Sequence, residues 1–314
     1  MKRHQIILAA VLAVQVALAA IIYWPRTTAD GAPTKLLGDL TADQVTRLTI
    51  EAQGDERIVL SREMGAWSLP EADGYPARDE TVTEFVEKLV DLGSDRLVTE
   101  TAASHERLQV TDDTYQRRIT IGATDGLERV VLLGSSPAYG ATHVRLEGED
   151  EVYMTSDLSA WEANTAASGW VESGYLQLAT ADLQQVTVSN AQGTVTVVQS
   201  APDEWSLVGM AEGEVVDTYA VASYGQRVAS ISLLEPLGKT EDPGYGLSDP
   251  SATISITLAD RTVTLRVGAK DPLDNSYVIK SSESPYYVRV SEYVVKEYVE
   301  GSRETLLQQP EVTE

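Results

Sequence analysis

The chain has 314 residues, no cysteine and a formal net charge of −24. The lack of cysteine excludes disulfide bonds and a lipoprotein anchor, so stability must come from apolar burial, for which each half of the chain is long enough. The acidic excess excludes nucleic acid and anionic lipid headgroups as partners, because like charges repel, and it predicts a soluble surface or, alternatively, a docking face for a basic partner or for divalent cations.

The N-terminal segment predicts a membrane anchor. Residues 1–4 form a basic cytoplasmic head, and residues 5–24 are almost entirely apolar. A helix of about 20 residues reaches about 30 Å, the thickness of a hydrocarbon core, and Pro25 would end it. The positive-inside rule then predicts a single-pass protein of the inner (cytoplasmic) membrane with a periplasmic C-terminal domain. A cleaved signal peptide, with residues 17–19 as its cleavage site, is the alternative.

The remainder of the chain repeats itself. We interpret residues 25–39 as a tether, residues 40–172 as repeat copy one, residues 178–307 as repeat copy two and residues 308–314 as a tail. The same short motifs recur in the same order, which indicates a duplicated unit. The matching motifs are Leu48-Thr49-Ile50 with Val186-Thr187-Val188, Trp67-Ser68-Leu69 with Trp205-Ser206-Leu207, Val131 to Gly134 with Leu265 to Gly268, and Val152-Tyr153-Met154 with Tyr286-Tyr287-Val288.

The sequence pattern of each copy predicts a hairpin, a third strand, one amphipathic helix and four further strands. Alternating β-branched residues indicate the strands, and apolar residues at helical spacing from Val82 to Leu92 indicate the first helix. In copy one we expect strands at 45–51, 56–62, 67–69, 117–121, 129–133, 142–146 and 151–155, with a closing helical turn at 158–163. In copy two we expect strands at 183–188, 194–199, 205–207, 253–258, 262–267, 276–280 and 286–290, with helices at 218–229 and 292–298.

Runs of strands around single helices favour antiparallel sheets over a parallel fold. We therefore expect the α+β class: two tandem repeats, each of mostly antiparallel strands with one main amphipathic helix, after an N-terminal transmembrane helix. Trp67 and Trp205 should anchor each helix to its sheet, because they lie where strand meets helix. A surface binding role for these two tryptophans is the alternative.

Several of these motifs also occur in an order known from other proteins. In copy two they are Tyr245-Gly246-Leu247-Ser248-Asp249-Pro250, Gly268, Tyr277-Val278 and Tyr286-Tyr287-Val288, and in copy one Trp67-Ser68-Leu69-Pro70, Gly134 and Val152-Tyr153. This order resembles the bacterial domain-of-unknown-function family 4340. Copy one departs from it at Glu106-Arg107-Leu108, and copy two at Val208, where copy one has Pro70. The resemblance implies two tandem copies of an auxiliary component of ABC-type export systems, including those linked to gliding motility, with no catalytic residues to carry over.

The motifs that could carry chemistry are incomplete. Gly238-Lys239-Thr240 matches the end of a phosphate loop, but Leu233 stands where that loop requires glycine. His105 and His143 belong to no zinc-binding motif, and the sequence has no G-x-S-x-G elbow. We therefore expect no enzyme activity, no cofactor and no metal site, unless a polar cleft unites one of these histidines with a serine and a carboxylate.

Two clusters of oxygen ligands and a group of tyrosines remain. The acids within residues 111–113 and 271–275 lack the spacing of an EF-hand, so we interpret them as turns. The chain has 14 Tyr against one Phe, and Tyr277, Tyr286 and Tyr287 follow one another closely in copy two. We interpret these three as candidate partner-binding residues, with ordinary strand packing as the alternative.

These observations lead to two hypotheses about function. The first is a membrane-anchored extracytoplasmic accessory protein of an ABC-type export system, which binds or scaffolds and is not catalytic. Its partners would be ABC-type permease subunits or other envelope proteins, and residues 5–24 would hold it in the membrane. The second is a free-standing envelope binding module for a wall polymer or glycan, which would use the tyrosines.

Overall fold

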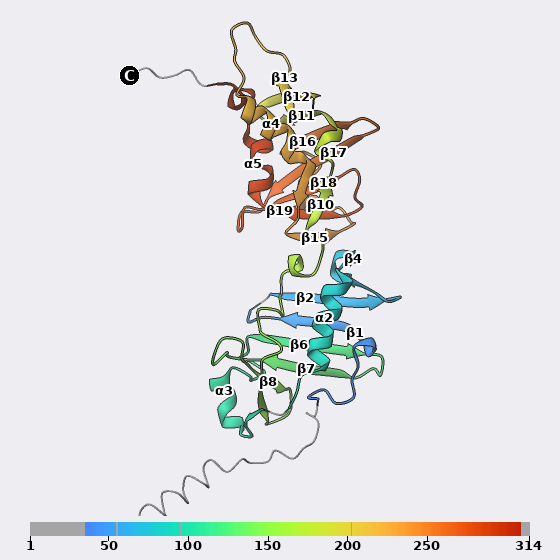
Figure 1. Cartoon of the computed structure of the whole chain (residues 1–314), viewed down its shortest axis with the longest axis vertical. Helices are drawn as coiled ribbons and strands as arrows, with labels where there is room; N and C mark the ends of the chain where they lie inside the picture. The colour runs from blue at the N-terminus through green and yellow to red at the C-terminus, as the bar shows by residue number, and fades with distance from the viewer. Residues whose placement is uncertain (1–34, 55, 95, 202, 309–314) are drawn as a thin grey trace, which may run out of the picture.

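Most of the chain is arranged in two antiparallel sheets that follow one another along the long axis of the molecule (Figure 1). The computed structural model describes residues 35–54, 56–94, 96–201 and 203–308. The strands of the first sheet are β1 (Val45–Glu51), β2 (Arg57–Glu63), β3 (Ala66–Leu69), β4 (Tyr75–Pro76), β5 (Leu97–Thr99), β6 (Arg117–Ala123), β7 (Glu128–Leu133), β8 (Thr142–Leu146) and β9 (Val152–Thr155). The strands of the second sheet are β11 (Leu183–Asn190), β12 (Gly193–Ala201), β13 (Glu204–Leu207), β15 (Glu235–Gly238), β16 (Ala252–Leu258), β17 (Thr262–Lys270), β18 (Tyr277–Ser281) and β19 (Tyr287–Val290).

Helices and short turns connect these strands. The α-helices are α2 (Asp79–Val90), α3 (His105–Leu108), α4 (Thr218–Gln226) and α5 (Glu292–Glu300). The 3-10 turns are η1 (Ala42–Gln44), η2 (Pro70–Ala72), η3 (Ala102–Ser104), η4 (Ala167–Gly169), η5 (Thr180–Asp182), η6 (Arg227–Ala229), η7 (Pro243–Tyr245) and η8 (Arg303–Leu306). A small separate sheet pairs β10 (Gly174–Gln177) with β14 (Ser230–Ser232).

The two sheets have the same strand order. The first runs β4-β3-β2-β1-β6-β7-β8-β9-β5, and the second runs β13-β12-β11-β16-β17-β18-β19-β15. Apart from the added edge strand β4, every strand of the first sheet therefore has a counterpart in the same place in the second. In both halves the strand that closes the sheet, β5 or β15, comes after the helix in the chain and pairs with the last strand of the half.

The expected α+β class is wrong, because strands dominate the structure. The described residues are about 41% strand and 22% helix. The amphipathic pattern of α2 does form a helix, yet most strands of each half belong to one continuous antiparallel sheet. The helices cover part of a sheet face and do not form a segment of their own, so the protein is a mostly antiparallel β-structure.

The expected transmembrane helix falls on residues 5–24, which lie outside the described residues together with the head and most of the tether. Among the described residues, no helix is long and apolar enough to cross a membrane. The last part of the predicted tether belongs to the folded structure. Lys35 forms a β-bridge with Gly93, the backbone N–H of Leu36 donates to the carbonyl of Leu92 over 2.7 Å, and Leu37 is buried.

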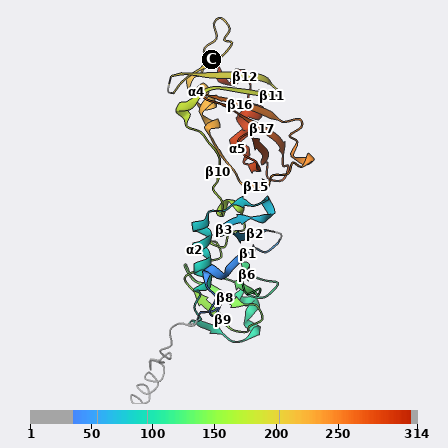
Figure 2. The ribbon, with the colours of Figure 1, turned by 90° about the vertical axis from the view of Figure 1, so that its right-hand side faces the viewer.

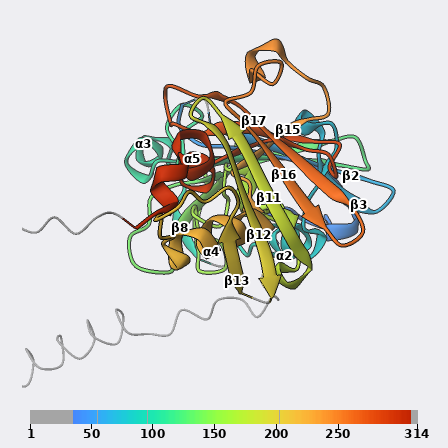
Figure 3. The same ribbon diagram turned by 90° about the horizontal axis from the view of Figure 1, so that it is seen from above.

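The main core lies between the sheets and the helices α2, α4 and α5. α2 lies on one side of the first sheet, where it buries Phe85 and its other apolar residues (Figure 2). α4 and α5 both lie beside the strands of the second sheet (Figure 3). These two helices contact one another, because the rings of Tyr224 and Tyr298 form an edge-to-face pair at 5.1 Å and the Tyr298 hydroxyl donates to the Tyr224 carbonyl.

Both repeated tryptophans are buried where strand meets helix. The backbone N–H of Trp67 donates to the carboxylate of Asp79, the first residue of α2, over 2.6 Å. Gly225 of α4 lies directly on the ring of Trp205, where an added Cβ would come within 2.4 Å of a ring carbon. The structure therefore places these side chains in the core and not at the surface.

A short helical turn crosses the opposite face of each sheet. Side chains alternate along β7, so Leu132 points away from the main core and packs with Leu108 of α3 in a small cluster. In the second sheet Val278 and Leu247, the latter just after η7, form the corresponding cluster. The backbone of each turn approaches a glycine of the sheet. An added Cβ would lie 2.2 Å from the Leu108 carbonyl oxygen at Gly134 and 2.0 Å from that of Tyr245 at Gly268.

Candidate binding site at the junction of the two sheets

A tight loop after β3, in the first sheet, contacts the edge of the second sheet. Pro70 begins η2, and the backbone then turns through Asp73 and Gly74, which both have positive φ. The turn directs the Asp73 carboxylate at the end of β15, where it accepts a hydrogen bond from the backbone N–H of Lys239 over 2.6 Å. Gly238 has a φ of 93°, and an added Cβ there would lie 2.6 Å from the Asp73 carboxylate. The Gly-Lys-Thr segment thus forms an intramolecular contact in this structure.

Aromatic side chains complete the junction. The ring of Tyr286 packs edge-to-face on Tyr75 with 4.6 Å between centroids, and its hydroxyl donates to the Gly74 carbonyl over 3.1 Å. The hydroxyl of Tyr175 donates to the Tyr286 carbonyl over 2.7 Å and accepts from the backbone N–H of Ser281. Burial, aided by the neighbouring phenols, raises the pKa of Tyr75, and burial also raises the pKa of Tyr175.

The structure does not gather the three candidate tyrosines on one accessible face. Tyr277 is 4% exposed and packs in the main core, whereas Tyr287 is 7% exposed and packs in the cluster on the opposite face. The Tyr287 hydroxyl donates to the carboxylate of Glu241 over 3.0 Å. Of the three, Tyr286 lies at the junction, and its ring and hydroxyl contact the first half of the chain. These tyrosines offer a partner little surface.

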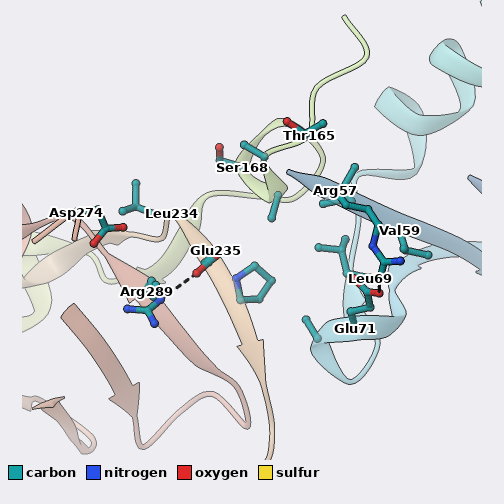
Figure 4. Close-up of a pocket in the computed structure, with 15 residues that line it drawn as sticks. Arg57, Val59, Leu69, Glu71, Thr165, Ser168, Leu234, Glu235, Asp274 and Arg289 are labelled. Atoms are coloured by element: carbon teal, nitrogen blue, oxygen red, sulfur yellow. Dashed lines mark hydrogen bonds and ion pairs between the residues drawn. The ribbon is translucent and has the colours of Figure 1, made fainter. Parts of the chain in front are cut away.

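A cavity of about 410 Å³ opens beside this junction. One wall carries the ion pair of Arg57 and Glu71, from β2 and η2, and the other carries the pair of Arg289 and Glu235, from β19 and β15 (Figure 4). Its remaining lining comes from the connection between the halves, mainly residues 165–168, and from apolar side chains of both sheets. Pockets of about 300–1,000 Å³ between two folded units are common ligand sites, so this cavity is the candidate binding site.

Sequence reasoning missed the cavity residues, because they carry no signal of spacing. Arg57 and Arg289 are separated by most of the chain and come together through the junction. Arg289 is further held in place, since its Nη1 lies 3.2 Å from a carboxylate oxygen of Asp271 and 3.3 Å from the hydroxyl of Ser276. The charged groups on both walls are therefore preorganised.

The two histidines lie in the first half, away from this cavity. His105 is buried, and its Nε2 is 2.9 Å from the carbonyl oxygen of Asp150. The Nδ1 of His143 is 3.1 Å from the hydroxyl of Ser135, and burial lowers the pKa of this imidazole. The Ser135 hydroxyl donates to the carbonyl of Leu108, so it helps to hold α3 on the sheet.

The oxygen-rich segments form turns. A carboxylate oxygen of Asp271 accepts from the N–H of Leu273 over 2.9 Å, and one of Asp274 accepts from the N–H of Ser276 over 2.8 Å. In the other segment the Thr111 hydroxyl accepts from the N–H of Thr114. Within the part of the chain that the structure describes, no group of three or more His, Cys, Asp or Glu side chains is arranged to hold a metal ion.

A family model, Domain of unknown function (DUF4340), matches residues 67–250, more than half of the chain. The chain belongs to this family. The matched segment begins at Trp67 in β3 and ends at Pro250 before β16, so the DUF4340 match crosses the junction and includes parts of both sheets. No curated protein and no solved structure matches this DUF4340 chain.

Replacing Gly238 of this DUF4340 protein with alanine should loosen the junction. The substitution forces a side chain into a positive φ and against the Asp73 carboxylate. Gly213→Ala is the matched control, since Gly213 has a similar φ of 87° and open space around it. We expect the distance distribution between spin labels at Leu127→Cys and Tyr219→Cys to broaden with Gly238→Ala alone. Equal distributions for both alanine variants would contradict this account of the junction.

Proposed function

We propose that this DUF4340 protein is a periplasmic binding or scaffolding subunit of an ABC-type export system, without catalytic chemistry of its own. The apolar segment 5–24 and its basic head support anchorage in the inner membrane with the folded part outside. The resemblance of its motifs to auxiliary components of such systems supports the kind of partner.

We also propose that the two sheets are copies of one unit. Their identical strand order, leaving β4 aside, supports duplication, as do the equivalent glycines Gly134 and Gly268, each under a crossing turn. Two copies placed end to end form a cavity that neither copy has alone. A ligand in this cavity contacts both units at once and stabilises their relative position.

The junction cavity is the observation that carries the proposal. Its walls present one ion pair each and the carboxylate of Asp274, and Thr165 and Ser168 line the space between the two pairs. Paired charges and hydroxyls suit a polar polypeptide segment, which brings donors and acceptors of its own and little net charge. We therefore assign the cavity to a segment of a transporter subunit.

Photocrosslinking in intact membranes tests this proposal. The photoreactive p-benzoylphenylalanine is placed at Ser168, an exposed residue of the cavity, and as a control at Leu127, an exposed residue of the β6–β7 turn. We expect Ser168 to form a crosslink to a subunit of an ABC-type transporter and Leu127 to form none. Crosslinks to no transport subunit from either position would count against the proposal.

The anchor and the alternative function need separate measurements. Replacement of residues 1–24 by a cleavable signal peptide, which preserves export, should release the protein from washed membranes into the soluble periplasmic fraction. A wall-polymer module would instead sediment with isolated cell wall. That alternative relied on an accessible tyrosine face, and both Tyr277 and Tyr287 are buried.

A further inference from the structure

One tryptophan differs from the others in the described part of the chain. Trp67, Trp170 and Trp205 are buried, whereas Trp161 is 78% exposed. An indole is a large apolar surface to leave in water, and tryptophan is among the residues most enriched at the centres of binding interfaces. The exposed ring of Trp161 is therefore a candidate contact for a binding partner.

The loop around Trp161 is held on both sides. The backbone N–H and hydroxyl of Ser159 donate to the carboxylate of Glu162, which also pairs with Lys88 of α2. Farther along, the carbonyl of Asn164 accepts from the indole N–H of Trp170 over 2.8 Å. Because these neighbours are fixed, the loop backbone that carries Trp161 has little conformational entropy left to lose on binding.

Trp161 borders a pocket of about 260 Å³. Its aromatic wall is the edge-to-face pair of Phe85 and Trp170, with 5.0 Å between ring centroids. Glu84 and Lys88, on the outer side of α2, line both this pocket and a second open depression farther along the helix. The two hollows thus form one groove, which begins at the aromatic rings and continues along α2.

The groove is acidic along α2. The second depression adds Glu87, Asp91 and Asp157 to Glu84. Its one lysine is already paired with Glu162, and Asp91 is paired with Lys35, so three of these four carboxylates have no ion-pair partner among the described residues. Such a groove repels anionic lipid and anionic polymers and attracts a positively charged ligand.

We propose that this groove docks a basic segment of a protein partner. An arginine side chain stacks on the indole of Trp161, because the planar guanidinium combines a cation–π contact with low hydration. Basic residues next to it lie along the acidic side of α2. The inference rests on the proposed function, since it describes how a transporter subunit is held at a second place, away from the junction cavity.

Peptide binding to the full-length chain in detergent tests the groove. The probes are two fluorescein-labelled ten-residue peptides, one alternating arginine and leucine and the other with glutamate in place of every arginine. We expect the basic peptide to bind, with an affinity that falls as salt rises, and the acidic peptide not to bind. Trp161→Ala should weaken binding of the basic peptide by about 30-fold, the loss typical of a central interface tryptophan.

Two further variants control this experiment. Glu84→Gln should weaken binding several-fold and reduce its salt dependence, because one carboxylate of the groove is lost. Tyr139→Ala removes an even more exposed aromatic ring elsewhere in the first half and should leave the affinity unchanged. Equal affinity of wild type and Trp161→Ala for the basic peptide, or no binding of that peptide to the wild type, overturns the inference.

The outcomes also separate the groove from the proposed function. If Ser168 crosslinks to a transporter subunit while the basic peptide binds Trp161→Ala as well as wild type, the groove inference alone fails. If the peptide requires Trp161 while no position crosslinks to a transport subunit, the groove binds basic segments and the export function fails.

Discussion

Gly268→Ala should lower the free energy of unfolding by about 3 kcal/mol, at the upper end of the usual cost of overpacking. An added Cβ would lie 2.0 Å from the carbonyl oxygen of Tyr245, and backbone atoms at that distance must move. The turn of η7 would be lifted from the sheet, and the cluster around Leu247 would be exposed with it. Urea unfolding of the full-length protein in detergent, followed by circular dichroism, measures the change.

Gly134→Ala should have a similar effect in the first sheet, where the added Cβ meets the carbonyl of Leu108. Gly122→Ala in β6 is the control, because its nearest neighbour is the Cβ of Arg47 at 3.3 Å and a small shift relieves the contact. We expect a change below about 1 kcal/mol for this control. A loss at Gly134 or Gly268 no larger than that at Gly122 would show that the crossing turns are free to move.

Arg145→Ala should destabilise the first half by about 3 kcal/mol, the cost of removing a buried, hydrogen-bonded cation and leaving a buried carbonyl without a donor. Arg145 is 5% exposed and donates to the carbonyls of Val110 and Glu149 over 2.6 and 2.8 Å, and to the Asp112 carboxylate over 2.8 Å. Without the guanidinium the buried carbonyl of Val110 stays unpaired, and the segment after α3 loses its attachment to β8.

Asp112→Asn distinguishes the contribution of the ion pair to stability from that of the carbonyl contacts. The Asp112 side chain is 63% exposed, so loss of its charge should cost less than about 1 kcal/mol. Both variants are compared with wild type in the same urea titration. Equal losses for Arg145→Ala and Asp112→Asn would mean that the salt bridge, and not the pair of carbonyls, provides the stability.

The second sheet has a related contact at the equivalent position. Val131 pairs with Leu146 across β7 and β8, and Leu265 pairs with Ser281 across β17 and β18, so Arg145 and Lys280 occupy corresponding places. The ammonium of Lys280 donates to the carbonyls of Ser281 and Ser284. Both halves therefore use a cationic side chain to hold backbone carbonyls on the face opposite the main core.

The long elements could be predicted from local sequence, because alternation and helical spacing report directly on burial. The strands around Leu48, Ile254 and Leu265 and the helix from Asp79 lie where these patterns place them. The short strands β4, β5, β10, β14 and β15 were missed. They are two to four residues long, and for all of them except β4 the partner strand is distant in sequence. The α+β class was wrong because strands dominate the described residues, where β4, β5 and β15 lengthen the two large sheets and the helices are a minor part.

The candidate sites depend on contacts that local patterns do not encode. The tyrosines were noticed because they are frequent, but sequence spacing did not reveal that Tyr277 and Tyr287 pack on opposite faces. In the sequence nothing distinguishes Arg57, Glu71 and Arg289 from ordinary surface charges. They line one cavity only because the two sheets are in contact, for example through the hydrogen bond between Asp73 and Lys239. No tryptophan stands at a matching place in the second half of the chain, and that difference is the signal that could have identified Trp161.

The border strands near the junction each contain a proline, Pro76 in β4 and Pro236 in β15. Proline has no N–H to donate, so a strand that contains it extends a hydrogen-bonded ladder poorly. Unprotected borders of sheets tend to anneal with one another. These two prolines therefore oppose pairing of the two halves into one continuous sheet, and the space between the halves remains available to a ligand.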